Sequence, residues 1–214
     1  MGKESINDLY WKSNRQNLSF RHTSALKLLR TKPEDGPILD CGGGDGLISH
    51  LLIEKGYEVV CIDNSKIALS RAKEHGAKVF VHDLNEILPF KDEKFATILH
   101  LSVLEHLIAN PNQVLKELAR VTKKDIIIGT TNWCHWMFRF QNLFGIYPRF
   151  PRPEKGDIRW ISYSLTKKAI LKNHLKIVKT DMCEFSPRIP KIFARIWPNL
   201  TAMNFNFLCE KKAR

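Results

Sequence analysis

The sequence predicts an α/β fold in which a doubly wound, mostly parallel sheet of seven strands carries helices on both faces. Three observations support this fold class. Apolar runs alternate with amphipathic runs along almost the whole chain, a glycine-rich turn follows the first of the apolar runs, and an aspartate ends the next one. The strands are expected at residues 37–41, 57–62, 77–81, 95–101, 124–130, 175–184 and 203–210.

The amphipathic runs between these strands predict the helices. The helix at 111–121 has clear start signals, because Asn110 can cap its first turn and Pro111 suits its first position. The last apolar run, 202–208, follows Trp197-Pro198-Asn199 without a full crossover helix, which favours an antiparallel edge hairpin. The helices are expected at residues 18–30, 46–55, 65–75, 111–121 and 164–173.

Length and composition limit the class of protein. At 214 residues with 43% hydrophobic residues the chain suits one well-buried core, which predicts a single domain over residues 1–214. No apolar run is long enough for a transmembrane helix, and residues 1–11 lack the organisation of a secretory signal, so we expect a cytoplasmic protein. The five cysteines are scattered and never spaced C-x-x-C, so neither a disulfide framework nor a metal site is expected.

The net charge of +12 is concentrated in the last part of the chain. Residues 1–132 contain 18 Lys and Arg against 17 Asp and Glu, whereas residues 133–214 contain 16 against 5. This excess has two interpretations. It forms a solvated basic surface, or it serves an anionic partner such as a nucleic acid or a membrane surface.

The turn D-C-G-G-G-D-G at residues 40–46 joins a buried strand to a helix almost without side chains. Glycines permit a ligand to approach the backbone, and a helix start offers free amide groups. A dinucleotide fingerprint would need glycine at position 47, which is Leu47, and a phosphate-binding loop would end in Gly-Lys-Ser or Gly-Lys-Thr. The turn therefore predicts a nucleotide-type cofactor, but neither a dinucleotide nor phosphoryl transfer.

Polar residues end each of the first four expected strands. The carboxyl ends of neighbouring parallel strands share one crevice, so these residues are expected to meet. Acidic groups and leucines around a glycine floor suit a ligand with a ribose, an adenine and a cationic centre, and S-adenosylmethionine has all three. The residues are Asp40 before the glycines, Asp63 with Asn64, Asp83 with Leu84, and 102–106 after the fourth strand.

These motifs, at residues 40–46, 62–63, 82–84 and 102–107, resemble the successive motifs of class I S-adenosylmethionine-dependent methyltransferases. The resemblance covers about residues 18–210 and implies a Rossmann-like sheet of order 3-2-1-4-5-7-6 with its last strand antiparallel. A narrower pattern, N-x-x-H-W-x-x-R-x-Q at residues 132–141 with Gly145 and Pro148, resembles the MetW-like methyltransferases of methionine biosynthesis. The chain departs from that pattern at Thr131 and Ile146.

The superfamily resemblance implies a site for S-adenosylmethionine, with S-adenosylhomocysteine as product. Asp63 would accept hydrogen bonds from both ribose hydroxyls, and Asp83 would receive the adenine amino group. Asp40 would brace the turn or meet the ammonium group. The implied cofactor set is Asp40, Gly42, Gly44, Asp63, Asn64, Asp83, Leu84 and Leu101.

Methyl transfer chiefly requires that the acceptor be held close to the methyl group. A hydroxyl or a protonated amine also needs a base, and His106 and His135 are the candidates. Each has a purely structural alternative, since His106 could bond a turn carbonyl and His135 could anchor the helix that follows it.

The segment Trp133 to Trp160 holds 8 of the 21 aromatic residues, interleaved with arginines. Trp133, Trp136, Met137, Phe140, Leu143, Phe144 and Tyr147 fall on one helical stripe. Three interpretations compete: core packing of an extra helix, an acceptor pocket with an arginine clamp, or a surface for anionic membrane or RNA. The candidate substrate residues are Trp136, Arg139, Tyr147, Arg149 and Arg159.

We therefore expect a methyltransferase that acts on an anionic or amphipathic small molecule. The alternatives are a MetW-like accessory protein that works with a protein partner, and an RNA methyltransferase. The expected layout is an N-terminal helical cap at 1–35, a cofactor-binding half at 36–132, an aromatic and basic insertion or lid at 133–163, and a substrate-side half with the terminal hairpin at 164–214.

Overall fold

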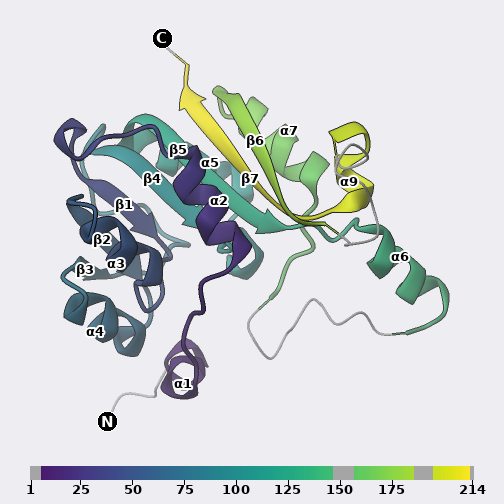
Figure 1. Ribbon diagram of the computed structural model, residues 1–214, viewed down its shortest axis with the longest axis horizontal. Coiled ribbons are helices and arrows are strands. Elements are labelled where there is room, and N and C mark those ends of the chain that lie inside the picture. Colours follow the sequence, from purple (N-terminus) through teal and green to yellow (C-terminus); the bar gives the residue numbers. More distant parts are fainter. Residues whose placement is uncertain (1–5, 147–156, 186–194, 213–214) are drawn as a thin grey trace.

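The computed structural model describes residues 6–146, 157–185 and 195–212. Its centre is a seven-stranded sheet of order β3-β2-β1-β4-β5-β7-β6 (Figure 1). The first five strands are parallel, and β7 runs antiparallel to both β5 and β6. The predicted fold class and strand order are confirmed. The strands are β1 (Ile38–Cys41), β2 (Val59–Asp63), β3 (Lys78–Val81), β4 (Phe95–Leu101), β5 (Thr122–Thr131), β6 (Leu175–Phe185) and β7 (Ala202–Lys211).

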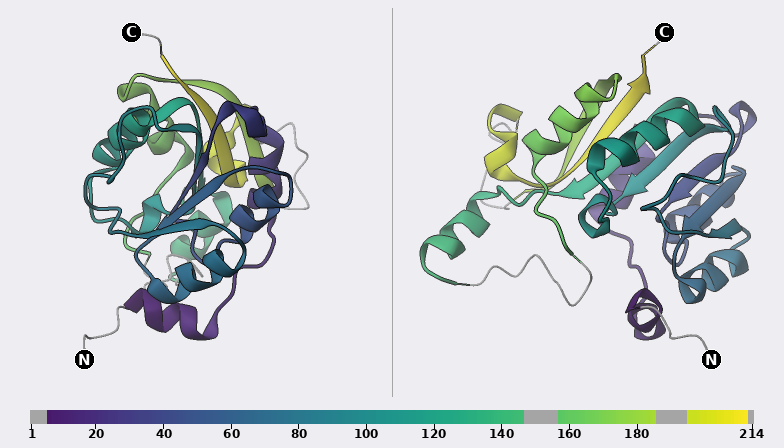
Figure 2. Two further views of the ribbon diagram at one scale, coloured as in Figure 1. Left: turned by 90° about the vertical axis from the view of Figure 1, so that its left-hand side faces the viewer. Right: turned by 180° about the vertical axis from the view of Figure 1, so that it is seen from behind.

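Helices cover both faces of the sheet (Figure 2). None of the described helices is long and apolar enough to cross a membrane. All five expected helices are present, with ends within two residues of the expected ones. The helices are α1 (Ile6–Ser13), α2 (Phe20–Leu28), η1 (Pro33–Asp35), α3 (Leu47–Ile53), α4 (Lys66–Glu74), η2 (Leu104–His106), α5 (Pro111–Val121), α6 (Trp136–Leu143), α7 (Tyr163–Lys172) and α9 (Pro198–Thr201).

The central strands of the sheet are buried on both faces, which explains why their sequences are continuous apolar runs. In β4, Ile98 faces a core cluster shared with α5 and α7, and its neighbour Leu99 faces the opposite cluster shared with α2 and α3. Each of these two side chains is at most 1% exposed. The sheet is therefore held rigidly between helices, and its strand ends are fixed relative to one another.

The start of α5 forms as its sequence predicts. The Asn110 side chain accepts a hydrogen bond from the amide of Asn112 at 2.9 Å, and Pro111 occupies the first turn. Val114, Leu115, Leu118 and Val121 are buried against the sheet. Burial of such side chains contributes about 1.5–3 kcal/mol each, so packing of this face holds the helix.

Helix α1 lies apart from the sheet, within the segment 1–35 that was expected as a helical cap, although a defined helix was expected only at 18–30. It packs against α4, where Asp8 accepts hydrogen bonds from the Ser65 hydroxyl at 2.7 Å and from the amide of Ile67 at 3.3 Å. A helix of 8 residues is marginal by itself, so these contacts with a distant segment stabilise it. Figure 1 shows α1 below the carboxyl ends of the parallel strands.

The crossover from β3 to β4 contains no helix. Residues 82–94 form only turns and bends along the sheet. Parallel strands are usually joined through a helix that covers the sheet face. Here a loop takes that place beside α5.

Candidate active site

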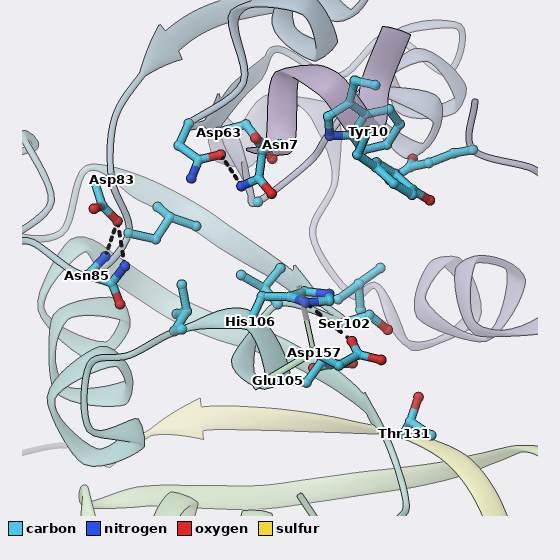
Figure 3. Close-up of a pocket in the computed structure, with 18 of the residues that line it drawn as sticks. Asn7, Tyr10, Asp63, Asp83, Asn85, Ser102, Glu105, His106, Thr131 and Asp157 are labelled. Carbon is cyan, nitrogen blue, oxygen red and sulfur yellow. Dashed lines mark hydrogen bonds and ion pairs between the residues drawn. The ribbon is translucent and has the colours of Figure 1, made fainter. Parts of the chain in front are cut away.

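A cavity of about 230 Å³ opens at the carboxyl ends of the parallel strands, between them and α1 (Figure 3). Six of the eight expected cofactor residues line it, together with His106. The sheet topology thus brings together residues from the ends of four strands, β1 to β4. Its lining residues are Asn7, Tyr10, Trp11, Gln16, Arg21, Gly42, Asp63, Asn64, Asp83, Leu84, Asn85, Leu101, Ser102, Val103, Glu105, His106, Leu107, Thr131, Trp133 and Asp157.

Gly42 forms the floor of this cavity after β1. Its φ of 81° lies in the left-handed region, and its amide donates to the carbonyl of Ile62 at 2.8 Å. A Cβ atom here would lie 2.4 Å from the Val103 side chain, closer than real Cβ contacts. Only glycine therefore allows the turn to pass so close to Val103.

Asp63 ends β2 beside the glycine turn. Its Oδ2 accepts from the amide of Gly44 and its Oδ1 from the amide of Ser65, both at 3.0 Å. Burial raises the pKa of this carboxyl above its ordinary value, against the lowering effect of these amides. The carboxylate thus joins the turn after β1 to the start of α4 at the wall of the cavity.

Two asparagines support the neighbouring polar residues. Asn7 of α1 donates to the Asn64 side-chain oxygen at 2.7 Å. Asp83 accepts from both the backbone amide and the side-chain amide of Asn85, at 2.9 and 2.7 Å, through Oδ1 alone (Figure 3). Oδ2 of Asp83 keeps its capacity to accept a hydrogen bond from a ligand.

Asp40 and Gly44 do not line the cavity. Asp40 is buried beneath the turn, where Oδ2 accepts from the Ser49 hydroxyl at 2.6 Å. Burial raises its pKa to about 7, because a buried carboxylate loses its hydration. Gly44 is covered by Trp11, whose ring would lie 2.6 Å from a Cβ atom at this position. Of the two roles considered for Asp40, the geometry therefore favours bracing the turn.

Sequence reasoning missed Arg21, which among the described residues is the one arginine or lysine that lines this cavity. It lies in α2 and donates to the Ser102 hydroxyl at 2.5 Å, while its buried Nε has no hydrogen-bond partner. Ser102 itself has a positive φ of 55°. No local pattern around Arg21 indicated a site, because its place depends on how α2 packs across the sheet.

Glu105 belongs to the segment 102–106 that was expected at the crevice, but no role of its own was expected for this residue. Its side chain is buried and Oε2 accepts from the Thr130 hydroxyl at 3.1 Å. Desolvation raises the pKa of this carboxyl. Its backbone carbonyl accepts from the amides of Ile158 and Arg159, which brings residues 157–160 back to the cavity.

His106 lies in the short helix after β4 and faces Asp157 in the cavity (Figure 3). Its Nδ1 is 3.3 Å from the Asp157 Oδ1. The His106 side chain is 38% exposed and that of Asp157 only 10%, so the carboxylate is the more enclosed partner. A carboxylate on Nδ1 leaves Nε2 of a histidine to act on another group.

His135, the other candidate base, lies outside the cavity. It is fully buried, and its Nδ1 accepts from the amide of Met137 at 3.3 Å, which caps α6. Burial lowers its pKa. This geometry favours the anchoring role for His135.

Three of the five candidate substrate residues are described by the structure, and none of these three is part of this cavity. Trp136, Arg139 and Arg159 lie outside it, and Tyr147 and Arg149 lie outside the described residues. Arg139 donates to the carbonyl of Cys134 at 2.8 Å, and Arg159 donates to the carbonyl of Ile108. From the same segment, Trp133 lines the cavity and stacks on Trp160 with ring centroids 5.7 Å apart.

The interpretation of the aromatic stripe as core packing is wrong for α6. Phe140, Leu143 and Phe144 are 54%, 78% and 62% exposed, whereas Phe138 on another side of the helix is buried. Figures 1 and 2 show why, since α6 projects from the end of the sheet and only its inner side meets the body. The helix thus presents an apolar stripe to solvent.

The residues present fit a ligand of mixed polarity. Asp63 and Asp83 accept hydrogen bonds, the guanidinium of Arg21 suits an acidic group, and Leu84 and Val103 offer apolar surface. Within the described ranges, no group of three or more His, Cys, Asp or Glu is arranged to hold a metal ion. A nucleoside with hydroxyls, an amino group and a carboxylate matches these donors and acceptors.

Comparison with known sequences points to one class of enzyme. Residues 39–128 match the family described as a methyltransferase domain. The chain is 28% identical to the ubiquinone biosynthesis O-methyltransferase of Hahella chejuensis over 69% of this chain and 63% of that protein. It is 34% identical to an uncharacterised protein of Methanocaldococcus jannaschii over 50% of this chain and 44% of that one. The chain thus spans less than two thirds of the length of these two relatives.

Solved structures share the fold along most of the chain. A S-adenosylmethionine-dependent methyltransferase of Thermotoga maritima has a TM-score of 0.67 at 16% identity, covering 97% of this chain and 91% of that one. A methyltransferase in complex with the Trm112 activator of Haloferax volcanii has a TM-score of 0.64 at 16% identity, covering 92% and 91%. The geranyl diphosphate C-methyltransferase of Streptomyces coelicolor, solved with S-adenosylhomocysteine, has a TM-score of 0.62 at 12% identity, covering 90% and 77%.

Proposed function

We propose that the chain, whose residues 39–128 match a methyltransferase domain, is a class I S-adenosylmethionine-dependent methyltransferase that methylates a hydroxyl group of a small amphipathic molecule. One observation carries the proposal. Gly42, Asp63, Asp83 and His106, from separate strand ends, line a single cavity. The first three suit the cofactor, and the histidine suits the proton of the acceptor.

Each cofactor contact follows from the atoms available. Asp63 accepts from the ribose hydroxyls, and Oδ2 of Asp83 accepts from the adenine amino group. The guanidinium of Arg21 would bind the carboxylate of the cofactor, because a guanidinium pairs well with a carboxylate. Asn64 and Leu84 flank the ring. The bound cofactor supplies a methyl group on a sulfonium, which makes that carbon electrophilic.

His106 acts as the base for the acceptor hydroxyl. Its Nε2 takes the proton while Asp157 beside Nδ1 holds the ring in place and stabilises the charge that forms. The carboxylate of Asp157 is largely enclosed, so its interaction with the ring is weakly screened by solvent. The chain must also position the oxygen of the acceptor hydroxyl, and the walls of the cavity do this.

The acceptor has an apolar body. Trp133 reaches the cavity and stacks on the exposed Trp160, so an aromatic surface leads from the site toward solvent. The apolar stripe of α6 begins nearby in sequence and offers a cover for an apolar substituent. Several relatives are named ubiquinone biosynthesis O-methyltransferases, and methyl transfer to oxygen in those proteins supports a hydroxyl as the acceptor here.

Two measurements, made one after the other, test this function. Isothermal titration of the full chain with S-adenosylmethionine and S-adenosylhomocysteine should give saturable binding with one site. Incubation with methyl-labelled cofactor and a cell extract should then place label in a small apolar fraction. Absence of cofactor binding would refute the proposal. Binding without label transfer would favour an accessory role with a protein partner, and label in RNA would favour the RNA methyltransferase.

A further inference from the structure

The part of the molecule that carries α6, α9 and the start of α7 exposes several large apolar side chains. Figure 1 shows α6 and α9 at one end of the molecule, opposite to α3 and α4. To the stripe of α6 this end adds Trp160 and Trp197, which are 60% and 55% exposed. We define the apolar face by its large exposed side chains, which are Trp136, Phe140, Leu143, Phe144, Trp160 and Trp197.

Asn132, which follows β5, ties the segments of the apolar face to one another. The residue is 0% exposed, and its side-chain nitrogen donates to the carbonyls of Asn199 and Ala202 at 3.0 and 2.7 Å. Its side-chain oxygen accepts from the amides of Cys134 and Tyr163 at 3.2 and 3.3 Å. The residues that start α6 and α7 and those of α9 therefore meet at one buried side chain, which fixes the apolar face at this end of the sheet.

The surroundings of the apolar face are positively charged. Within the described ranges 133–146, 157–168 and 195–201, five residues are Arg or Lys and one is acidic. The acidic residue is Asp157, which is paired with His106 in the cavity at the strand ends. Lys167, Lys168 and Arg195 are exposed. The apolar face thus lies among exposed cations, and no exposed carboxylate of these ranges offsets their charge.

Of the partners that carry negative charge, an anionic lipid bilayer complements both properties of the face. Tryptophan rings prefer the level of the headgroups, apolar side chains enter the acyl boundary, and cations meet anionic headgroups. RNA bases stack on aromatic rings, but Leu143, the most exposed residue of the face at 78%, has no ring to offer. A second copy of the chain is disfavoured, because its equivalent face carries the same positive charge.

We propose that the apolar face docks on an anionic lipid bilayer, with its tryptophans at the headgroups and the stripe of α6 in the acyl boundary. The contact belongs to the surface of the chain and needs no cofactor. Trp160 also stacks on Trp133, which lines the cavity at the strand ends. An apolar acceptor dissolved in the bilayer thus reaches the site along these rings, and this last step alone rests on the proposed function.

Co-sedimentation of the full chain with vesicles tests the docking. Vesicles of phosphatidylcholine with phosphatidylglycerol should retain the chain at least tenfold better than vesicles of phosphatidylcholine alone. Raising the salt from about 0.05 M to about 0.5 M should weaken this retention, because salt screens charges at the surface. Hydrogen exchange should show protection of the α6 amides by anionic vesicles and none in α4. No retention, or equal retention by the two kinds of vesicle, would overturn the proposal.

One pair of variants tests the apolar part of the contact. Leu143→Asp should weaken retention by anionic vesicles at least fivefold, because it places a carboxylate in the stripe of α6. Ile87→Asp, in the loop from β3 to β4, should leave retention unchanged, although Ile87 is similarly exposed at 74%. Equal effects of the two changes would place the contact elsewhere and refute the proposal.

A second pair of variants tests the charge. The double change Lys167→Glu with Lys168→Glu should weaken retention by anionic vesicles at low salt, because it reverses two exposed cations beside the apolar face. The double change Lys55→Glu with Lys73→Glu alters the net charge equally at the opposite end of the molecule and should act much less. Equal effects would show attraction by net charge alone and would contradict docking through this face.

Other outcomes assign the apolar face to other partners. Binding of single-stranded RNA that Leu143→Asp abolishes, without retention by vesicles, would refute the proposal in favour of RNA. A dimer in analytical ultracentrifugation that Leu143→Asp dissociates, again without retention by vesicles, would refute it in favour of a second copy. Retention by anionic vesicles in a chain that does not bind S-adenosylmethionine would refute the proposed function and leave the docking surface standing.

Discussion

Oδ2 of Asp63 accepts a hydrogen bond from the amide of Gly44 at 3.0 Å, so the end of β2 directly holds the turn that follows β1. The other oxygen of the same carboxylate holds the amide of Ser65 at the start of α4. These two segments and the cavity meet at this one side chain. Loss of the carboxylate must therefore affect both the ligand and the walls that receive it.

We expect Asp63→Ala to weaken binding of S-adenosylhomocysteine by about 1–3 kcal/mol, which is roughly 5- to 150-fold. The free energy of unfolding should also fall, because two amides lose their acceptor. Titration calorimetry and chemical denaturation measure the two effects. Glu58→Ala is the control, since Glu58 pairs only with Lys78 on the surface near the other end of β2. Wild-type affinity in Asp63→Ala would show that the carboxylate does not contact the cofactor.

Alanine substitutions at two glycines can distinguish the effect of backbone strain from the effect of a steric clash at the new Cβ atom. Gly42 and Gly56 have similar positive φ values of 81° and 84°, but a Cβ at Gly42 would meet Val103 at 2.4 Å and one at Gly56 would meet nothing within 4 Å. Gly56→Ala should lower the free energy of unfolding by about 1–2 kcal/mol and leave cofactor affinity unchanged. Gly42→Ala should cost more stability and also reduce cofactor affinity at least tenfold. Equal effects of the two changes on affinity would remove Gly42 from the site.

Asp40 should make the free energy of unfolding depend on pH. Burial raises its pKa from 3.8 to about 7, so the folded chain keeps this proton between pH 4 and pH 7 while the unfolded chain has lost it. The unfolded state binds fewer protons in that window, and stability therefore falls as pH rises. In Asp40→Asn this contribution, up to about 4 kcal/mol, is absent. The stability of the variant relative to wild type should rise from pH 4 to pH 7.

Denaturation curves at a series of pH values check this expectation. The comparison with wild type is needed because His22 and His100 act in the opposite sense. Burial lowers their pKa values from 6.5 to about 4, so their contribution to stability is lost as pH falls from 6.5 to 4. Those two groups are the same in both chains. If Asp40→Asn and wild type ran parallel across the window, the carboxyl would be ionised in the folded state.

We expect His106→Gln to reduce the rate of methyl transfer by about 10²–10⁴-fold, because the acceptor loses its base. Asp157→Asn should lower the rate less and shift the pH profile, because it removes the charge beside Nδ1. Cofactor affinity should stay within a factor of about three in both variants. The rate of label transfer into the identified acceptor measures the effect. His75→Gln, a histidine at the end of α4 outside the cavity, is the control.

The exposed stripe of α6 should matter for the acceptor and hardly for stability. Leu143 is 78% exposed, so Leu143→Asp should change the free energy of unfolding by no more than about 0.5 kcal/mol. The KM for an apolar acceptor should rise several-fold, while affinity for the cofactor is retained. Leu165→Asp on α7, at 49% exposure, provides the matched control. An unchanged KM would assign the stripe to another partner.

The sequence alone determined the strands of the sheet and most of its helices, and the resemblance to class I methyltransferases implied the order of the strands. The spacing of apolar residues and the residue types that begin or end a helix are local features of a sequence. The start of α5 at Asn110 and Pro111 could therefore be predicted directly. The meeting of Gly42, Asp63 and Asp83 was also predictable, because the carboxyl ends of parallel strands share one edge. These features depend on spacing along the chain and on one topological rule.

Tertiary structure alone decided which side chains face the cavity. Arg21, Asp157 and the residues of α1 reach it from segments far apart in sequence, and no local pattern records such a contact. Asp40, which precedes the glycine turn, lies beneath that turn and accepts a hydrogen bond from the Ser49 hydroxyl. The spacing of apolar residues in α6 predicted an apolar stripe, but it did not predict whether that stripe faces the protein or solvent. Periodicity fixes which residues share a side of an element, whereas the direction of that side depends on packing between distant parts of the chain.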